Sequence, residues 1–220
     1  MSLDERTLSA LVAVAIFLVI GFPVHEFAHA LVAYRLGDGT AKLFGRLTLN
    51  PLVHLDPLGS AILALSALVG GFFIGWAKPT PVNPSMLRYG HRGEALVAAA
   101  GPVSNFVLAV LAAIVIRIFV ATQPEATPIL QFVYLVFTWF LWINVSLFIF
   151  NLFPIPPLDG SKVLFAFLPA RTVWQVRPFL EQWGFVILLA IMFLPPGSDS
   201  IGARILGPIF DAIYSLLVGT

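Results

Sequence analysis

The feature that most constrains this chain is the pentapeptide His25-Glu26-Phe27-Ala28-His29, which follows a run from Leu8 to Ile20 without a charged residue. Histidines four positions apart share one face of a helix and can bind one divalent ion. The glutamate beside the first histidine can hold a water molecule and accept its proton. Because apolar sequence surrounds the motif, we expect a metal site inside a lipid bilayer, where it would hydrolyse peptide bonds.

The overall composition supports a membrane location. The chain is 59% hydrophobic and 10% charged, with a mean hydropathy of +0.96, whereas soluble domains carry roughly 25% charged residues. The net charge of +1 indicates no nucleic-acid partner. The absence of cysteine excludes thiolate metal sites, so His, Asp and Glu are the available ligands.

The apolar runs predict an all-α polytopic membrane protein with about five to six membrane helices, since a helix needs roughly 20 apolar residues to cross a bilayer. Gly21 and Pro23 predict a kink just before the histidine motif. The expected helical runs are 8–36, 58–76, 94–120, 129–151, a short run at 179–194 and a shorter run at 205–218 that could be a partial span or an interfacial helix.

Two segments near the motif predict other structure. The partly alternating sequence from Lys42 to Leu49, which contains Gly45 and is followed by Asn50-Pro51, favours a short β-hairpin. The segment from Leu58 to Arg92 contains an apolar stretch and then three prolines within 77–84, which favour extended backbone. We expect this segment to enter the membrane, turn at Gly70-Gly71 or at Trp76-Ala77, and return as a re-entrant gate.

A catalytic zinc site needs a third protein ligand and an open position for water. Asp159 follows a proline-broken helix end and is one candidate, although it could instead cap a helix that starts near Ser161. His54 and His91 compete for the same role. Both lie in polar connections, where a solvated histidine is the alternative, and His54 could act as a gate.

Three motifs together resemble the site-2 protease family of intramembrane zinc metalloproteases. They are the sequence 22–29 around the histidines, Ala100-Gly101-Pro102 with Asn105, and 151–160, which reads N-x-x-P-x-P-P-L-D-G. The resemblance covers residues 8 to about 170, and Ser161 replaces a second glycine that many relatives carry. It implies a single domain over 1–220 with a catalytic core over 8–170 and C-terminal helices over 171–220, without a PDZ or CBS module.

The same resemblance implies one Zn²⁺ per chain, with His25, His29 and Asp159 as ligands and Glu26 as the general base. It also implies that Asn105 faces the catalytic chamber. There Asn105 could donate a hydrogen bond to the tetrahedral oxyanion. The alternative is that Asn105 forms a hydrogen bond between helices.

Topology follows from the requirement that the ligands meet. If every apolar run crossed once, the ends of the first and fourth runs would lie on opposite faces, so a segment between them must fail to cross. The segment 58–92 is the best candidate. With the N-terminus outside, nine of the twelve Lys and Arg are cytoplasmic, against seven for simple alternation with the N-terminus inside. The nine are Arg35, Lys42, Arg46, Lys78, Arg88, Arg92, Lys162, Arg171 and Arg177.

The expected activity is that of an intramembrane zinc metalloendopeptidase in regulated intramembrane proteolysis, with a transmembrane protein or peptide as substrate and the lipid bilayer as its surroundings. The active site would face the cytoplasmic side of a prokaryotic cell membrane. The 42–49 strand would pair with the unwound substrate, and Ala77 to Asn83 would hold its other edge. The alternatives are a membrane metal transporter and an inactive protein that binds transmembrane segments.

Overall fold

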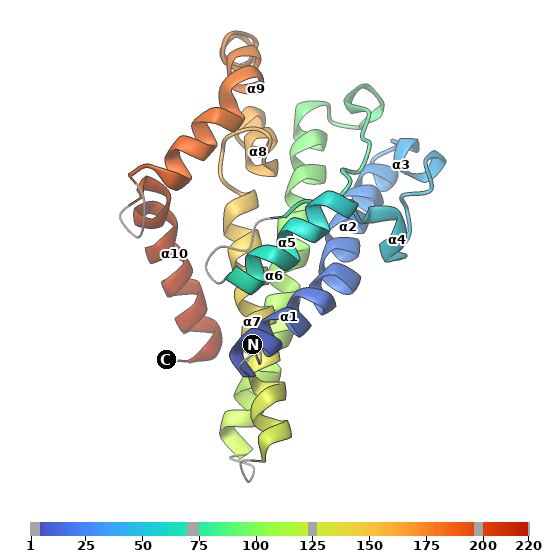
Figure 1. Cartoon of the computed structure of the whole chain (residues 1–220). Coiled ribbons are helices and arrows are strands. Elements are labelled where there is room, and N and C mark those ends of the chain that lie inside the picture. The colour runs from blue at the N-terminus through green and yellow to red at the C-terminus, as the bar shows by residue number, and fades with distance from the viewer. Residues whose placement is uncertain (1–4, 70–74, 123–126, 196–199, 220) are drawn as a thin grey trace.

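The computed structural model describes residues 5–69, 75–122, 127–195 and 200–219, and the described elements are helical apart from one isolated bridge. Long helices alternate with short helical turns and connections (Figure 1). They are α1 (Glu5–Ile16), the π-helix η1 (Phe17–Gly21), α2 (Phe22–Arg35), α3 (Thr40–Leu43), α4 (Pro51–His54), α5 (Pro57–Val69), the 3₁₀ helix η2 (Pro84–Met86), α6 (His91–Thr122), α7 (Pro128–Asn151), α8 (Asp159–Phe167), α9 (Ala170–Phe193) and α10 (Ile201–Val218).

Among the described residues, five helices are long and apolar enough to cross a membrane, which confirms the predicted all-α membrane architecture. They are Glu5–Arg35, formed by α1, η1 and α2 together, and α6, α7, α9 and α10. The described part of the apolar helix α5 is shorter than these spans. The Gly70-Gly71 turn lies outside the described residues.

The hydrophobic core lies where α1, α6 and α7 pack together (Figure 1). Small residues on α6, among them Ala109, Ala112 and Ala113, are almost fully buried there in the same cluster as Leu141 and Val145 of α7. Small side chains let helix backbones approach closely, which is the usual basis of helix association in a bilayer. This packing fixes α6 as the central helix against which α2 and α8 also rest.

Where the sequence predicts a kink before the histidine motif, the structure has the π-helical turn η1. The N–H of Phe22 donates to the carbonyl oxygen of Phe17, five positions earlier. Single π-helical turns within α-helices are frequent next to functional sites, because the extra residue rotates everything that follows. Here the turn sets the rotation of α2, which carries His25, Glu26 and His29.

The predicted β-hairpin over 42–49 is wrong, because residues 40–43 form helix α3 and a turn follows. The N–H of Arg46 donates to the carbonyl of Ala41 at 2.8 Å, and the N–H of Gly45 donates to Lys42 at 3.0 Å, with a φ of 67° at Gly45. These are the bonds of a Schellman motif, in which a glycine ends a helix in the left-handed conformation. The alternation of apolar residues therefore reflects a helix end rather than a strand.

The far end of α6, away from the histidines, fixes the end of α10. The guanidinium of Arg117 donates to the carbonyl oxygens of Leu216 and Leu217, both at 2.6 Å. These carbonyls belong to the last turn of a helix, where intrahelical donors run out and a cation is favourable. The C-terminal end of α10 therefore lies at the same end of the bundle as the C-terminal end of α6.

Candidate metal centre

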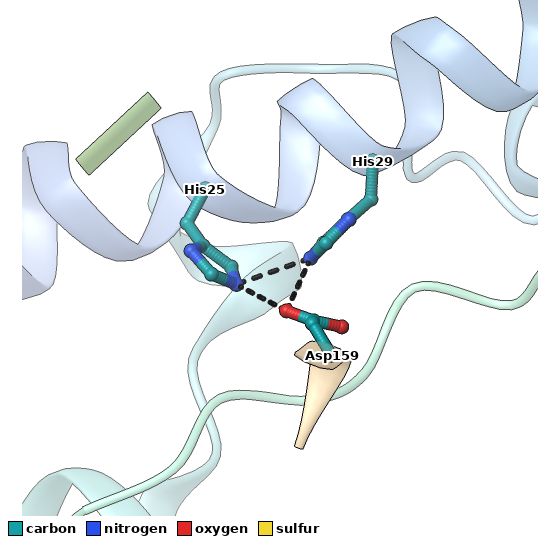
Figure 2. Close-up of side chains that lie close together, drawn as sticks. All are labelled: His25, His29 and Asp159. Atoms are coloured by element: carbon teal, nitrogen blue, oxygen red, sulfur yellow. Dashed lines mark hydrogen bonds and ion pairs between the residues drawn. The ribbon is translucent and has the colours of Figure 1, made fainter. Parts of the chain in front are cut away.

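Three side chains converge on one point between α2 and α8, and Figure 2 shows both imidazoles directed at the carboxylate. The Nε2 atoms of His25 and His29 lie 3.5 and 3.2 Å from Oδ2 of Asp159, and 3.1 Å from each other. Ligand atoms around a tetrahedral zinc ion, with bonds of about 2.0–2.2 Å, are about 3.4 Å apart. The spacing of the three atoms therefore suits one zinc ion.

The second ring nitrogen of His29 fixes its tautomer. Nδ1 lies 2.7 Å from the carbonyl oxygen of Val97 on α6. A carbonyl can only accept, so Nδ1 of the neutral ring carries the proton and Nε2 presents a lone pair toward Asp159. Such a hydrogen bond on the nitrogen remote from the ion is the usual arrangement in metal-binding histidines.

A longer chain of hydrogen bonds fixes the tautomer of His25. Asn144 on α7 donates from Nδ2 to the carbonyl of Phe140 at 2.9 Å, so its Oδ1 accepts from Nδ2 of Asn105 at 3.0 Å. Oδ1 of Asn105 therefore faces Nδ1 of His25, at 2.6 Å, as an acceptor. The proton of neutral His25 then sits on Nδ1, and Nε2 has a free lone pair.

The hydrogen bonds thus place two lone pairs and a carboxylate oxygen against one another, an arrangement that a cation satisfies. In the protonated form of the cluster, burial acts to raise the pKa of Asp159. Hydrogen bonds from the two imidazoles outweigh burial and hold that pKa well below its usual range. The residues present fit a divalent ion with nitrogen and oxygen ligands, and they leave room for water on the cavity side.

Two glycines allow the elements around the centre to approach closely. A Cβ built on Gly101 of α6 would lie 2.5 Å from Cε1 of His29 and 2.6 Å from Cε1 of His25. A Cβ on Gly160 would collide with the carbonyl oxygens of Leu152 and Phe153. Gly101 therefore lets α6 pack directly on both imidazoles, and Gly160 lets α8 start tightly under the end of α7.

Glu26 lies on α2 between the two histidines and is 8% exposed. It lines a cavity of about 290 Å³ together with both histidines, Asp159 and Asn105. Its carboxylate accepts hydrogen bonds from Thr80, in the proline-rich segment after α5, a contact that the sequence did not predict. A carboxylate in this position can take a proton from water in the cavity.

The other residues considered from sequence lie elsewhere or serve differently. His54 is fully buried, its Nε2 lies 2.8 Å from the carbonyl of Thr48, and it does not line the cavity. His91 is largely exposed beside Glu94 at 3.7 Å. Leu158 is the N-cap of α8, and Asp159 is its first residue, with its carboxylate against the two imidazoles. The sequence analysis did not identify Asn144. Its signal was available, because Asn144 is a polar residue inside an apolar run.

Comparison with known proteins identifies the family. The profile of Peptidase family M50 matches residues 13–195. The chain therefore belongs to Peptidase family M50, the family of the site-2 proteases, which confirms the resemblance seen in the sequence motifs. Its family and the long apolar helices of the described residues make it an integral membrane protein.

Curated relatives carry names of the same class. The chain is 39% identical to YwhC of Bacillus subtilis over 87% of its own length and 84% of that protein, whose name proposes a zinc metalloprotease. It is 35% identical to Rip2 of Mycolicibacterium smegmatis and 30% identical to Rip2 of Mycobacterium tuberculosis, named in the same way. These matches cover 78% and 81% of this chain, but only 63% and 65% of the Rip2 proteins. No solved structure matches the chain.

Proposed function

We propose that this protein is an intramembrane zinc metalloendopeptidase that hydrolyses peptide bonds within or near transmembrane segments. Family membership and the names of the relatives support a zinc metalloprotease. The observation that carries the proposal is the convergence of two imidazole lone pairs and one carboxylate oxygen beside Glu26. His25, His29 and Asp159 would hold one zinc ion per chain.

The ion, when bound, would lower the pKa of a water molecule and polarise the scissile carbonyl group. Glu26 accepts the proton of the attacking water and delivers it to the amine that leaves. Asn105 lines the cavity, but its Oδ1 accepts from His25 and its Nδ2 donates to Asn144. Since both ends of this amide are engaged within the protein, we assign Asn105 to holding His25 rather than to binding the oxyanion.

The substrate must unwind locally before cleavage, because a helix occupies its own carbonyl groups in hydrogen bonds. The expected pairing strand over 42–49 does not exist, so the substrate has to be held by other elements of the cavity wall. Residues of the proline-rich segment, among them Pro79 and Val82, line the cavity and are the extended backbone available for this.

A metal transporter would carry ionisable ligands at several depths along a path. Among the described residues, His25, His29 and Asp159 form one group that could hold a metal. A glutamate beside a single site favours hydrolysis over transport, and it equally disfavours an inactive binding protein.

The active site lies at the end of the bundle where α2 and α7 end and α6 begins, and the nine basic residues predicted to be cytoplasmic follow or precede these ends. We therefore place the site toward the cytoplasmic side of a cell membrane.

Glu26→Gln tests the function. The variant should lose cleavage of a transmembrane peptide in detergent by about 10²- to 10⁴-fold, since it lacks a general base. It should still hold one zinc ion per chain, which Asp159→Ala should not. Glu5→Gln, at the distant end of α1, is the matched control and should cleave normally. Chelator-insensitive cleavage, or turnover retained in Glu26→Gln, would refute the assignment.

A further inference from the structure

The proline-rich segment over 77–83, here named the strap, lines the cavity and is attached at both ends. At its start, Leu55 and Ala77 form an antiparallel bridge and the N–H of Lys78 donates to the carbonyl of His54 at 2.8 Å. At its end, the N–H of Asn83 donates to Oδ2 of Asp38 at 2.7 Å. The strap is therefore held between α4 and the end of α2.

Asp38 is built into the end of the helix that carries the histidine motif. Gly37, with a φ of 105°, ends α2 in a Schellman motif, since its N–H donates to Tyr34 and the N–H of Asp38 donates to Ala33. Asp38 has no exposed surface, and its Oδ1 accepts from the N–H of Thr40 at 2.9 Å. Burial acts to raise the pKa of Asp38, but hydrogen bonds from Thr40 and Asn83 outweigh it and keep that pKa below its usual value.

At the middle of the strap, Thr80 binds the carboxylate of Glu26 twice. Its backbone N–H donates to Oε2 at 2.9 Å and its hydroxyl donates to the same oxygen at 2.7 Å. The hydroxyl also lies 3.1 Å from the backbone carbonyl oxygen of Glu26. Two donors on one oxygen fix the carboxylate and leave its other oxygen, Oε1, for a water molecule in the cavity.

Prolines on both sides make this donor rigid. Pro79 and Pro81 have fixed φ angles and no N–H, and each restricts the residue before it to extended conformations. Thr80 is therefore the one residue of the stretch 79–81 that can donate from its backbone, and its position is set before Glu26 is bound. A rigid donor loses little conformational entropy when it holds a side chain.

We propose that Thr80 is a positioning residue that holds Glu26 in the orientation for proton transfer, and that Asp38 acts through it by fixing the end of the strap. This inference rests on the proposed function of Glu26 as the general base. Thr80 itself does not touch the reacting atoms. Its effect should therefore appear in turnover rather than in substrate binding or metal content.

The test compares Thr80→Val with Thr80→Ser, and uses a fluorogenic single-transmembrane peptide in detergent. Valine keeps the shape and the backbone donor but removes the hydroxyl, while serine restores the hydroxyl. Thr80→Val should lower kcat by about 10- to 100-fold, the usual effect of removing an outer hydrogen-bond partner, with KM within about twofold and zinc content unchanged. Thr80→Ser should recover kcat to within about threefold of wild type. Thr122→Val, at the exposed far end of α6, is the matched control.

Asp38→Asn supplies a second, independent variant. It should lower kcat in the same direction. The double variant with Thr80→Val should fall no further than Thr80→Val alone, because residues acting through one contact are not additive. Full additivity would overturn the role of Asp38.

The outcomes separate this inference from the function itself. Wild-type protein without chelator-sensitive cleavage refutes the proposed function and the role of Thr80 with it. Normal kcat in Thr80→Val, equal losses in the valine and serine variants, or loss of zinc in Thr80→Val would each overturn the positioning role alone, while the peptidase assignment would stand.

Discussion

Replacing Gly101 with alanine should disable the metal centre although no ligand residue is replaced. The new Cβ would lie 2.5–2.6 Å from the Cε1 atoms of His29 and His25 and closest to Nε2 of His29. Ordinary contacts between such atoms are about 3.5–4.0 Å, so helix α6 or both imidazoles must move by about 1 Å. Movement of the helix is resisted by the close-packed core against α7.

A displacement of about 1 Å in a reacting geometry costs on the order of 10²-fold in rate. Overpacking of this kind costs about 1–3 kcal/mol of stability. We therefore expect Gly101→Ala to lower kcat/KM for a transmembrane peptide by about 100-fold and to weaken zinc binding, measured by competition with a fluorescent chelator. Thermal unfolding in detergent reports the stability change separately.

The chain offers a control for the backbone. Gly101 precedes Pro102 inside a helix, and a Cβ before proline disfavours helical backbone regardless of its neighbours. Gly207 also precedes a proline inside a helix, Pro208 of α10, but a Cβ added there would meet nothing within 4 Å. The difference between Gly101→Ala and Gly207→Ala therefore isolates contact with the imidazoles. Equal zinc affinity and activity in the two variants would refute the packing argument.

Two further predictions concern the ligand support and the topology. Asn105→Ala removes the hydrogen-bond acceptor of His25 and should weaken zinc binding by about 10- to 100-fold in the same chelator competition. Unchanged zinc affinity would show that the hydrogen bonds from Asn144 through Asn105 do not orient the imidazole of His25. The topology can be tested with single cysteines, because the chain has none of its own. Cysteines at Glu5, Thr127 and Gly219 should react with an impermeant thiol reagent from the outer face, and one at Ser85 only from the inner face. Labelling at Gly219 from the inner face would contradict the contact between Arg117 and the end of α10.

The outer location expected for the C-terminus differs from the location that counting one crossing per helix would give. If α9 and α10 each crossed fully after α7, the C-terminus would return to the cytoplasmic side. The contacts of Arg117 with Leu216 and Leu217 instead place the end of α10 beside the C-terminal half of α6, whose end we propose to lie on the outer side. Length and composition qualify each helix as a span, but a side-chain contact between distant helices decides where each one ends.

The long helices could be predicted from the sequence because their signal is local. Every backbone group in a bilayer must be satisfied within its own segment, so about 20 apolar residues predict a helix wherever they occur. The segment over 42–49 gave a false strand because alternation over a few residues does not distinguish a strand from a helix end. The deciding feature was the left-handed conformation of Gly45, which the sequence permits but does not require.

His25 and His29 could be proposed from sequence because two histidines four positions apart on a helix can bind one metal ion. The third ligand stayed open among three candidates until the resemblance to the site-2 protease family implied Asp159. The supports of these ligands could not be proposed, since a backbone carbonyl such as that of Val97 leaves no trace in the residue type. The contact of Thr80 with Glu26 likewise joins residues far apart in the chain. Proline on both sides of Thr80 was the local signal, but it indicated extended backbone and not a partner.

The arrangement around α2 explains how a polar centre persists in apolar surroundings. The polar side chains of the motif meet groups whose own positions are set elsewhere: Val97 and Asn105 on α6, Thr80 on the strap, and Asp159 at the start of α8. A buried polar group without a partner costs more in a bilayer than in water. The groups on α6 that orient the two imidazoles therefore also stabilise α2 in the membrane, so removing the Asn105 amide should affect both metal binding and folding. Thr80 contacts Glu26 rather than a ligand, so removing its hydroxyl should leave the metal in place.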